Sequence, residues 1–386
     1  MRGAPLSAGF YCYPWNVHDP HALLAEFAAA GLTHLTVATS YHAGKFLQPR
    51  DPEARVYFPE DGTVYFRARC ERYGRLEPKI ATITAREDVL AALCDAAAMP
   101  VRAWTVLNHN SRLGWENPDI VARNAWGDPY YYSLCPASAD VQDYAVALCA
   151  DLAGQYPLQS LLLETPGWLT YDHGYHHEVA QFPVTPALER LLELCFCDSC
   201  MALARDGGVD TDALRQAVRI AGDALIAGDP AAALPDLAAY DGWRCSVVTD
   251  LCKRIRAAVR PEVGVRVIST CQRPHATCYR EGGDLAGFDR VTDGLELPIY
   301  QPSAGAAEAD LLDVLGQIGD PARLGVILRP GHPDMTSAAQ LRDTLARVTG
   351  AGVRDLSFYN YGLLPATQIQ WVRDAIGQLR EALADV

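Results

Sequence analysis

The most telling segment of the chain is Ser160-Leu161-Leu162-Leu163-Glu164-Thr165-Pro166, a short apolar run that ends in a carboxylate and a turn. A segment with helical spacing, 139–155, precedes it, and further helical segments follow it. Apolar runs of about four to eight residues that alternate with helices are typical of parallel βα units. Residues 160–163 are therefore predicted to form one strand of a parallel α/β sheet.

The same alternation continues along the whole chain. Short runs rich in Val, Ile, Leu and Thr recur, each followed by polar or aromatic residues and then by a helical pattern. The predicted strands are 8–11, 34–38, 103–107, 160–163, 265–269, 294–297, 325–328 and 355–358. The predicted helices are 21–30, 85–98, 139–155, 188–205, 211–227, 237–259, 307–317, 337–348 and 367–384.

The turn after the first predicted strand separates two kinds of α/β fold. A doubly wound sheet usually carries a Gly-rich phosphate-binding fingerprint there, whereas this chain has Cys12-Tyr13-Pro14-Trp15-Asn16. Eight predicted strands joined by helices favour a single (β/α)8 TIM barrel over 1–386. The connections after strands two, three and four are long, which usually indicates function. The connection after strand two, 40–100, contains a predicted hairpin of 55–58 and 64–67. The connection after strand three is 108–136, and the one after strand four is a helical, cysteine-containing insertion at about 165–260.

Charge and hydropathy narrow the class of protein. The net charge is −14, and no Lys/Arg cluster forms a stripe that could follow a phosphate backbone, so a nucleic-acid partner is not expected. The N-terminal residues lack the apolar core of a secretory signal, and no apolar run approaches the ~18 residues of a membrane span. We therefore expect a cytoplasmic protein without a membrane partner, and the sequence leaves a homo-oligomer open.

Amide, imidazole, guanidinium and aromatic groups gather just after the predicted strands. Active sites of TIM barrels are built at these strand ends, and such groups together are typical of a sugar site, because hydroxyls need polar partners and pyranose rings stack on aromatic rings. For each aromatic residue alone, a ring that caps the barrel core is an equal alternative. The candidate substrate-binding residues are Trp15, Tyr41, His42, His109, Asn110, Trp168, Asp172, His173, Tyr300, Arg329 and Asn360.

Two glutamates occur in the same local frame, an apolar run followed by Glu, one residue and Pro. They are Glu164 and Glu296. Glycoside hydrolysis normally uses two carboxylates across the scissile bond, and a glutamate at the end of a buried strand is costly to desolvate unless it is paired or used. We therefore predict Glu164 and Glu296 as the catalytic pair. The structural alternative is a salt bridge to a barrel arginine, with Arg329 as the obvious partner.

The segment Asp172-His173-Gly174-Tyr175-His176-His177-Glu178 lies in the connection after the fourth strand. Its spacing matches no established metal motif, because two ligands on one helical face are expected at i and i+4. The preferred interpretation is a loop that contributes Asp172 and His173 to substrate binding. A solvated polar loop and a catalytic metal site formed by His173, His176 and His177 remain as alternatives.

The cysteine-rich segment is Cys195-Phe196-Cys197-Asp198-Ser199-Cys200. In a reducing compartment clustered thiols indicate a bound metal rather than disulfides. Tetrahedral zinc needs about four ligands, and a site made of four thiolates is structural. Cys195, Cys197 and Cys200 supply three ligands; Cys135 is the first choice for the fourth and Cys245 the second. The alternative is a set of buried free thiols.

This arrangement resembles the barrel domain of family-42 β-galactosidases and related uncharacterised glycosyl-hydrolase-like barrels, most clearly over about 100–200. The resemblance implies Glu164 as the acid/base and Cys135, Cys195, Cys197 and Cys200 as ligands of a structural zinc. Leu163 stands where that family has Asn, and Glu296 belongs to the sixth strand rather than the seventh, so β-galactosidase specificity is not carried over. A carboxylate pair on strands four and six is similar to α-galactosidase-type barrels.

The sequence thus predicts a glycoside hydrolase that acts on a small glycoside or oligosaccharide and carries a structural zinc. Two other functions remain open. One is a carbohydrate-binding barrel without catalysis, and the other is a metal-dependent hydrolase or lyase that uses the histidine loop.

Overall fold

Eight parallel strands form a closed barrel in the computed structural model, which describes residues 5–173, 180–270 and 273–384. Each strand pairs with the next along the chain, and the last pairs with the first, which closes the ring. The strands are β1 (Ser7–Cys12), β2 (His34–Tyr41), β7 (Val101–Val106), β10 (Ser160–Glu164), β11 (Gly264–Ile268), β12 (Leu295–Pro298), β13 (Leu324–Leu328) and β14 (Asp355–Phe358). The predicted (β/α)8 barrel and its eight strands are confirmed.

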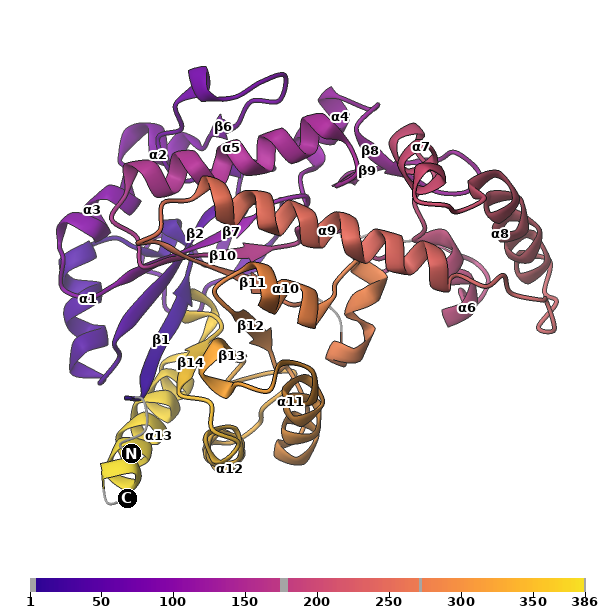
Figure 1. Cartoon of the computed structure of the whole chain (residues 1–386). Coiled ribbons are helices and arrows are strands. Elements are labelled where there is room, and N and C mark those ends of the chain that lie inside the picture. The colour runs from indigo at the N-terminus through magenta and orange to yellow at the C-terminus, as the bar shows by residue number, and fades with distance from the viewer. Residues whose placement is uncertain (1–4, 174–179, 271–272, 385–386) are drawn as a thin grey trace.

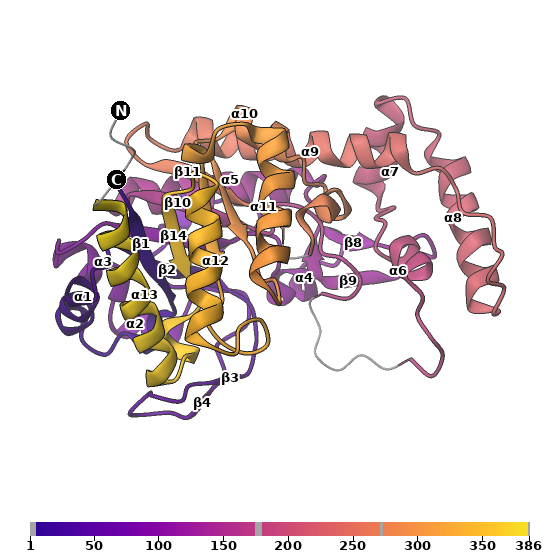
Figure 2. The same cartoon turned by 90° about the horizontal axis from the view of Figure 1, so that it is seen from below.

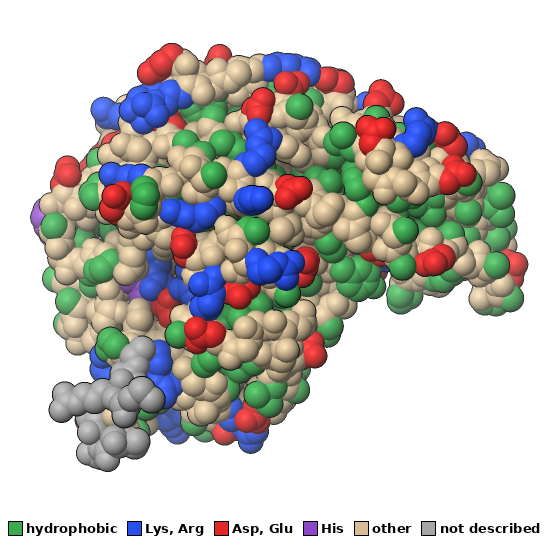
Figure 3. All heavy atoms as spheres, viewed as in Figure 1, with side chains coloured by type: hydrophobic (Ala, Val, Ile, Leu, Met, Phe, Trp, Pro, Cys, Tyr) green, Lys and Arg blue, Asp and Glu red, His purple; other side chains and the backbone are tan. Residues whose placement is uncertain are grey.

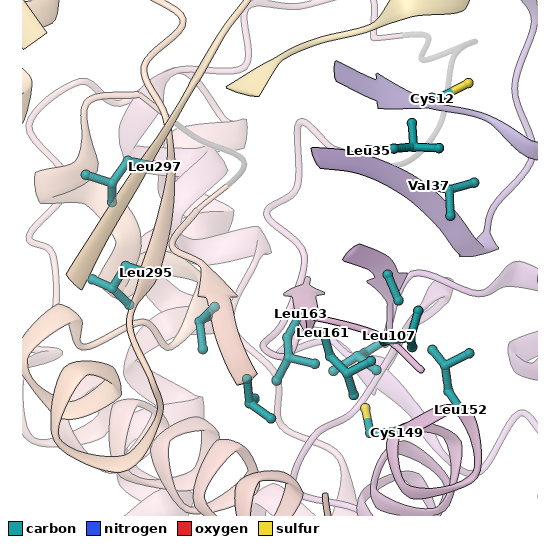
Figure 4. Close-up of a cluster of buried hydrophobic side chains, with 14 of the residues drawn as sticks. Cys12, Leu35, Val37, Leu107, Cys149, Leu152, Leu161, Leu163, Leu295 and Leu297 are labelled. Carbon is teal, nitrogen blue, oxygen red and sulfur yellow. The ribbon is translucent and has the colours of Figure 1, made fainter. Parts of the chain in front are cut away.

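Helices cover the outside of the barrel (Figure 1). They are α1 (Pro20–Ala29), α3 (Val89–Asp95), α5 (Ala139–Gln155), α9 (Ala238–Ala258), α10 (Leu285–Val291), α11 (Ala304–Ile318), α12 (Ala338–Gly350) and α13 (Ala366–Ala384). The main apolar core lies between strands and helices, where Leu161 and Leu163 lie beside Cys149 and Leu152 of α5 (Figure 4). In Figure 2, α11, α12 and α13 lie side by side along one flank.

The inward side chains of the strands form two different layers. Side chains alternate between the two faces of a strand, and the upper inward layer is mainly apolar and aromatic, with Tyr11, Trp104, Leu162, Ile268 and Ile327. The layer below it is charged, with ion pairs among Arg102, Arg266, Glu296 and Asp355. A charged layer is unusual, because branched apolar residues dominate the interior of most TIM barrels.

The connection after β2 differs from the prediction. It contains β3 (Phe46–Leu47), β4 (Val56–Tyr57), β5 (Thr63–Val64), β6 (Lys79–Ile80) and α2 (Thr82–Arg86). The predicted hairpin of 55–58 and 64–67 is wrong, because β4 pairs with β3 and β5 pairs with the end of β2. Burial explains this pairing: Val64 is 1% exposed and extends the barrel sheet, whereas Val56 is 46% exposed.

The connections after β7 and β10 form one side of the molecule. They contain α4 (Ser111–Glu116), β8 (Val121–Arg123), β9 (Pro129–Leu134), α6 (Pro186–Leu192), α7 (Asp198–Asp206) and α8 (Thr211–Ile226). The three helices α6, α7 and α8 project beyond the barrel (Figure 1) and share a small core with Leu191, Phe196, Val218 and Tyr240. On the face shown in Figure 3, acidic and basic side chains are interspersed, and hydrophobic side chains gather over this projecting part.

Two predicted helices are broken in the structure. The predicted helix 188–205 divides into α6 and α7, because residues 193–197 turn the thiols inward and α7 begins only after Cys197. The predicted helix 85–98 divides at Glu87, whose backbone is extended, and Asp88 caps α3 by accepting from the Ala91 amide.

Short elements that carry little periodicity were not predicted, among them α4 and α10. The 3-10 helices are Pro14–Asn16, Cys70–Arg72, His275–Glu281, Pro321–Arg323 and Tyr361–Leu363. Within the described residues, no helix has the length and apolar character needed to cross a bilayer.

Candidate functional site

A cavity of about 270 Å³ opens at the carboxyl ends of the barrel strands, the position at which TIM-barrel enzymes place their active sites. Tyrosines and a tryptophan form much of its wall, and one glutamate and two arginines reach it. The lining residues are Tyr11, Tyr41, His42, Trp104, Glu164, His173, Ile268, Thr270, Arg273, Pro298, Tyr300, Ile327, Arg329 and Tyr359.

Glu164 brings a carboxylate to this cavity. It is the last residue of β10, and its inward direction follows from the alternation that also turns Leu162 into the barrel. The indole Nε1 of Trp104, on the adjacent strand β7, donates a hydrogen bond to Glu164 Oε2. Such a bond fixes the orientation of the carboxylate at the cavity wall.

Three tyrosine hydroxyls meet beside Glu164. Tyr13 Oη lies 3.0 Å from Tyr41 Oη and 2.7 Å from Tyr359 Oη. Burial raises the pKa of all three phenols, so they are protonated at neutral pH. Tyr41 and Tyr359 line the cavity, where they can exchange hydrogen bonds with the hydroxyls of a ligand.

The opposite wall is cationic. The guanidinium of Arg329 lies 4.7 Å from the centre of the Tyr300 ring, and that of Arg273 lies 5.5 Å from it. Both arginines also bind Asp334, Arg273 at 2.9 Å and Arg329 through its Nε. One acid thus neutralises part of the charge and holds both guanidinium groups against the ring.

Several of the residues predicted from the sequence do meet in this cavity. They are Tyr41, His42, Glu164, His173, Tyr300 and Arg329. Each stands at or just after the end of a barrel strand or in the connection that follows it, where the sequence predicts the site.

Other predicted residues lie elsewhere. The Trp15 ring stacks on Tyr13 with ring centroids 4.4 Å apart, and the His109 ring stacks on His42 with ring centroids 3.8 Å apart. Asn110 caps α4 by accepting from the Leu113 amide. Trp168 is buried under Arg244, and Asn360 accepts from the Gly362 amide. These five residues do not line the cavity.

The histidine loop falls partly outside the described residues. Asp172 is exposed and does not line the cavity, whereas His173 does. His176 and His177 lie outside the described residues, so the structure leaves the metal alternative untouched.

Glu296 occupies a position different from the predicted one. It is the second residue of β12, fully buried within the barrel, and does not line the cavity. Its Oε1 lies 3.5 Å from Arg102 Nη1 and 3.9 Å from Arg266 Nη1. An ion pair to a barrel arginine was the structural alternative, but Arg329, the expected partner, instead pairs with Asp334.

The sequence did not single out Tyr11, Trp104, Ile268 and Ile327, which line the cavity from within the strands. Ile268 is the last residue of its strand, the other three precede the end of theirs by one or two residues, and all four point inward. The period-2 alternation of the strands could have indicated them, because it turns every second residue toward the barrel interior. Arg273 follows β11 in a connection without a periodic pattern, and nothing in the sequence pointed to it.

A second cluster of reactive side chains lies at one side of the barrel. Cys135, Cys195, Cys197 and Cys200 are buried, and their Sγ atoms all lie within 4.8 Å of one another. The Sγ atom of Cys135 lies 3.9 Å from that of Cys195, 3.5 Å from that of Cys197 and 3.4 Å from that of Cys200. A disulfide requires about 2.05 Å, so these four cysteines form no disulfide with one another.

The donor set of this cluster fits zinc. Four thiolates around a tetrahedral zinc at about 2.3 Å stand roughly 3.8 Å apart, close to the observed separations. The backbone amide of Arg123 also donates to Cys195 Sγ at 3.3 Å, as outer groups commonly do around bound thiolates. Cys245 is not part of the cluster, since its thiol donates to the carbonyl of Gly283.

Solved structures of glycoside hydrolases share this fold. The PgaB (BpsB) glycoside hydrolase domain from Bordetella bronchiseptica superposes with a TM-score of 0.61 at 15% identity, over 98% of this chain and 99% of that domain. The chain thus shares the TIM-barrel fold of this domain.

Two further structures match nearly all of this chain, but the matched part is less than half of each of those longer proteins. Alpha-L-fucosidase isoenzyme 2 from Paenibacillus thiaminolyticus has a TM-score of 0.56 and 13% identity, over 97% of this chain and 49% of that one. The alpha-galactosidase from Lactobacillus brevis has a TM-score of 0.50 and 11% identity, over 98% and 40%. No protein-family model and no curated protein matches the sequence. The similarity to family-42 β-galactosidases thus remains a resemblance.

Proposed function

We propose that the protein is a glycoside hydrolase that acts on a small glycoside or oligosaccharide in the cavity at the barrel mouth. One observation carries the proposal: Glu164 stands in a cavity walled by aromatic rings, held in orientation by Trp104. Aromatic faces offer apolar surfaces on which sugar rings stack, and the tyrosine and arginine groups offer partners for hydroxyls. The fold, shared with glycoside hydrolases, is consistent with this activity.

Glu164 is assigned as the acid that protonates the leaving oxygen. Among the lining residues in the described ranges it is the one that carries a carboxylate, and Glu296 is buried below the cavity. The second role, which a carboxylate normally fills, then belongs to a tyrosine hydroxyl or to a neighbouring group of the substrate itself. Both arrangements are established exceptions among glycosidases, and Tyr41 and Tyr359, whose rings line the cavity, are the described candidates for the first.

The test is hydrolysis of a panel of 4-methylumbelliferyl glycosides by the wild-type protein and by Glu164→Gln. The substitution keeps the size of the side chain and removes the acid, so kcat is expected to fall about 10²- to 10⁴-fold. Glu262→Gln, an exposed site before β11, is the matched control and should retain full activity. Undiminished turnover by Glu164→Gln on a substrate that the wild type hydrolyses would overturn the assignment.

A carbohydrate-binding barrel without catalysis is the second candidate. The single lining carboxylate in the described ranges favours it, because most glycosidases need two. Calorimetry on the same glycosides distinguishes the two functions: binding with no hydrolysis by the wild-type protein supports the second candidate.

We also propose that Cys135, Cys195, Cys197 and Cys200 hold a structural zinc. Cys135 follows β9 and the other three lie just before or within the start of α7, so the metal would join the β8–β9 wall to the projecting helices. A site closed by four protein thiolates leaves no position for a substrate, and the role is therefore to fix the wall beside the cavity.

A further inference from the structure

The charged layer inside the barrel connects five strands. Arg102 Nη1 lies 3.0 Å from Asp355 Oδ1 and 3.5 Å from Glu296 Oε1, while Arg266 Nη1 lies 2.5 Å from Asp355 Oδ2. His34 belongs to the same layer and lies 3.3 Å from Ser357 Oγ. Burying such charges gains little stability over an apolar core of the same size. Their presence directly below a cavity therefore calls for another explanation.

Polar atoms in and above this layer lack hydrogen-bond partners within the described ranges. Five inward-facing side chains contribute one such buried atom each: Tyr11 Oη, Thr36 Oγ1, Ser160 Oγ, Arg266 Nε and Glu296 Oε2. Buried polar atoms are nearly always paired, and an unpaired one costs about 1–3 kcal/mol. A group of them in one barrel interior indicates a site at which protons or hydrogen bonds are exchanged rather than a rigid scaffold.

A glycine on the neighbouring strand leaves space for the Glu296 carboxylate. A Cβ atom added at Gly325, on the neighbouring strand β13, would stand 1.9 Å from Glu296 Oε2. Any side chain larger than hydrogen at position 325 would thus displace the carboxylate. The fold holds this group at a definite place in the interior.

Tyr11 spans the distance between the charged layer and the cavity. It lines the cavity, and its ring contacts Trp104 edge to face with centroids 5.4 Å apart. Trp104 in turn donates to Glu164. Tyr11 is thus in contact with the group that orients Glu164, while its hydroxyl has no hydrogen-bond partner among the described residues. Burial and then the charge of Glu296 raise the pKa of Tyr11, so its hydroxyl lies within electrostatic reach of that carboxylate.

We propose that Glu296 is a positioning residue, which acts on the cavity from below through the Tyr11 hydroxyl. This inference deepens the proposed function and rests on it for its effect on turnover. Ionised Glu296 attracts the Tyr11 O–H and turns its oxygen lone pairs toward the cavity. Protonated Glu296 releases the O–H, which then donates into the cavity beside Glu164.

The electrostatics of the layer agree with this role. Burial raises the pKa of Glu296 to about 7; Arg266 and Arg102 oppose the shift and Asp355 adds to it. Burial also lowers the pKa of His34 and raises that of Tyr11, so both are neutral. The two arginines hold the pKa of Asp355 well below its usual value. Of the groups that face Glu296 from β1, β2, β7, β11 and β14, none changes its charge near neutral pH, so the titration there belongs to Glu296.

The test is the ¹³Cζ resonance of Tyr11 in protein labelled with [¹³C]tyrosine, identified by its loss in Tyr11→Phe and followed from pH 5 to 9. We expect a titration step near pH 7 in the wild type and its loss in Glu296→Gln. The step should persist in Glu164→Gln and in the surface control Glu262→Gln. A step that survives Glu296→Gln, or one that disappears in Glu164→Gln, would overturn the inference.

Two further measurements keep the inference testable if Glu296→Gln does not fold and separate it from the proposed function. The ¹³Cδ resonance of Glu296 in the wild-type protein should titrate near pH 7, and a midpoint below about 5 would contradict the inference. Both resonances are measured without a substrate. Absence of hydrolysis would therefore contradict the proposed function and would leave the coupling between Glu296 and Tyr11 standing. If glycosides are hydrolysed, the pH profile of kcat/KM should change in Glu296→Gln and not in Glu262→Gln; an unchanged profile would contradict the positioning role.

Discussion

Gly325 shows how a single residue supports the charged interior. Its missing side chain leaves the space that Glu296 Oε2 occupies at 1.9 Å from the position of an added Cβ. The strand around it, Leu324–Leu328, is otherwise fully apolar and nearly inaccessible. Glycine weakens a strand interior and often marks a close approach of this kind.

Gly325→Ala is expected to destabilise the protein by about 1–3 kcal/mol, because the methyl group overpacks a filled interior. Gly377→Ala, in the interior of α13 where an added Cβ meets nothing within 4 Å, is the matched control. It should stabilise the helix by roughly 0.5–1 kcal/mol. Urea unfolding of both variants measures the difference, and equal effects at the two positions would contradict this account of Gly325.

Glu164 and Glu296 show what the sequence could predict about the site and where it failed. Both follow an apolar run in the same local frame, so both were expected at the barrel mouth. The register places them at different heights: Glu164 is the fifth residue of β10, whereas Glu296 is the second of β12. The position of a residue along the barrel axis depends on the register between neighbouring strands. Register is a long-range property, so a local sequence pattern does not contain it.

Among the elements, the broken segment between α6 and α7 has the clearest local cause. Periodic apolar residues continue through 188–205 and predict one helix, yet the chain departs from helical geometry at 193–197 to gather three thiols. The Tyr240 hydroxyl donates to the carbonyl of Cys195 and holds this turn from the side of α9. The convergence of the thiols thus overrides helix propensity over one turn.

Cys197→Ser is expected to release the metal, because a tetrahedral thiolate site loses most of its affinity with one ligand. Elemental analysis of the purified wild type should find one zinc per chain, and the variant should have much less and unfold more easily. Cys245→Ser, a half-buried thiol outside the cluster, is the control and should keep its zinc. A wild-type protein without bound metal would contradict the zinc proposal.

The elements that the sequence predicted poorly are short. The eight barrel strands and the long helices such as α5 and α9 have strong periodic patterns and were predicted within a few residues of their ends. The two-residue strands β3 to β6 have too few residues for a pattern, and their pairing depends on which partner buries them. Local pattern therefore predicts the barrel and leaves the loops that wall the cavity to tertiary contacts.

The stability of the whole molecule should depend on pH through its charged interior. The raised pKa of Glu296, about 7 against an ordinary 4.5, means that the folded protein binds this proton more tightly than the unfolded chain. The resulting stabilisation is complete below about pH 4.5 and is lost as the pH rises through 7, on the order of 3 kcal/mol in total. Two groups act in the opposite sense. The lowered pKa of buried His34 favours the folded protein as the pH rises through the usual range of a histidine, and the depressed pKa of Asp355 acts only in the acid range below the usual pKa of an aspartate.

Urea unfolding at pH 5 and pH 8 tests this dependence. The contribution of Glu296 is isolated by comparing two proteins, because the amide of Glu296→Gln stays neutral at both values while His34 contributes equally to both. Relative to Glu296→Gln, the wild type should therefore lose stability between pH 5 and pH 8. A wild-type difference that Glu296→Gln fully retains would assign the effect to other groups.

The barrel closes by pairing its first strand with its last, which affects how the chain folds during translation. Ser7 of β1 pairs with Asp355 of β14, so the first strand finds its partner on one side only after nearly all of the chain is made (Figure 1). A ribosome adds about 5–20 residues per second, which leaves the open edge of β1 waiting for roughly 20–70 s. During translation the nascent half-barrel thus exposes the unpaired edge of β1, and binding by a chaperone would protect it until the ring closes.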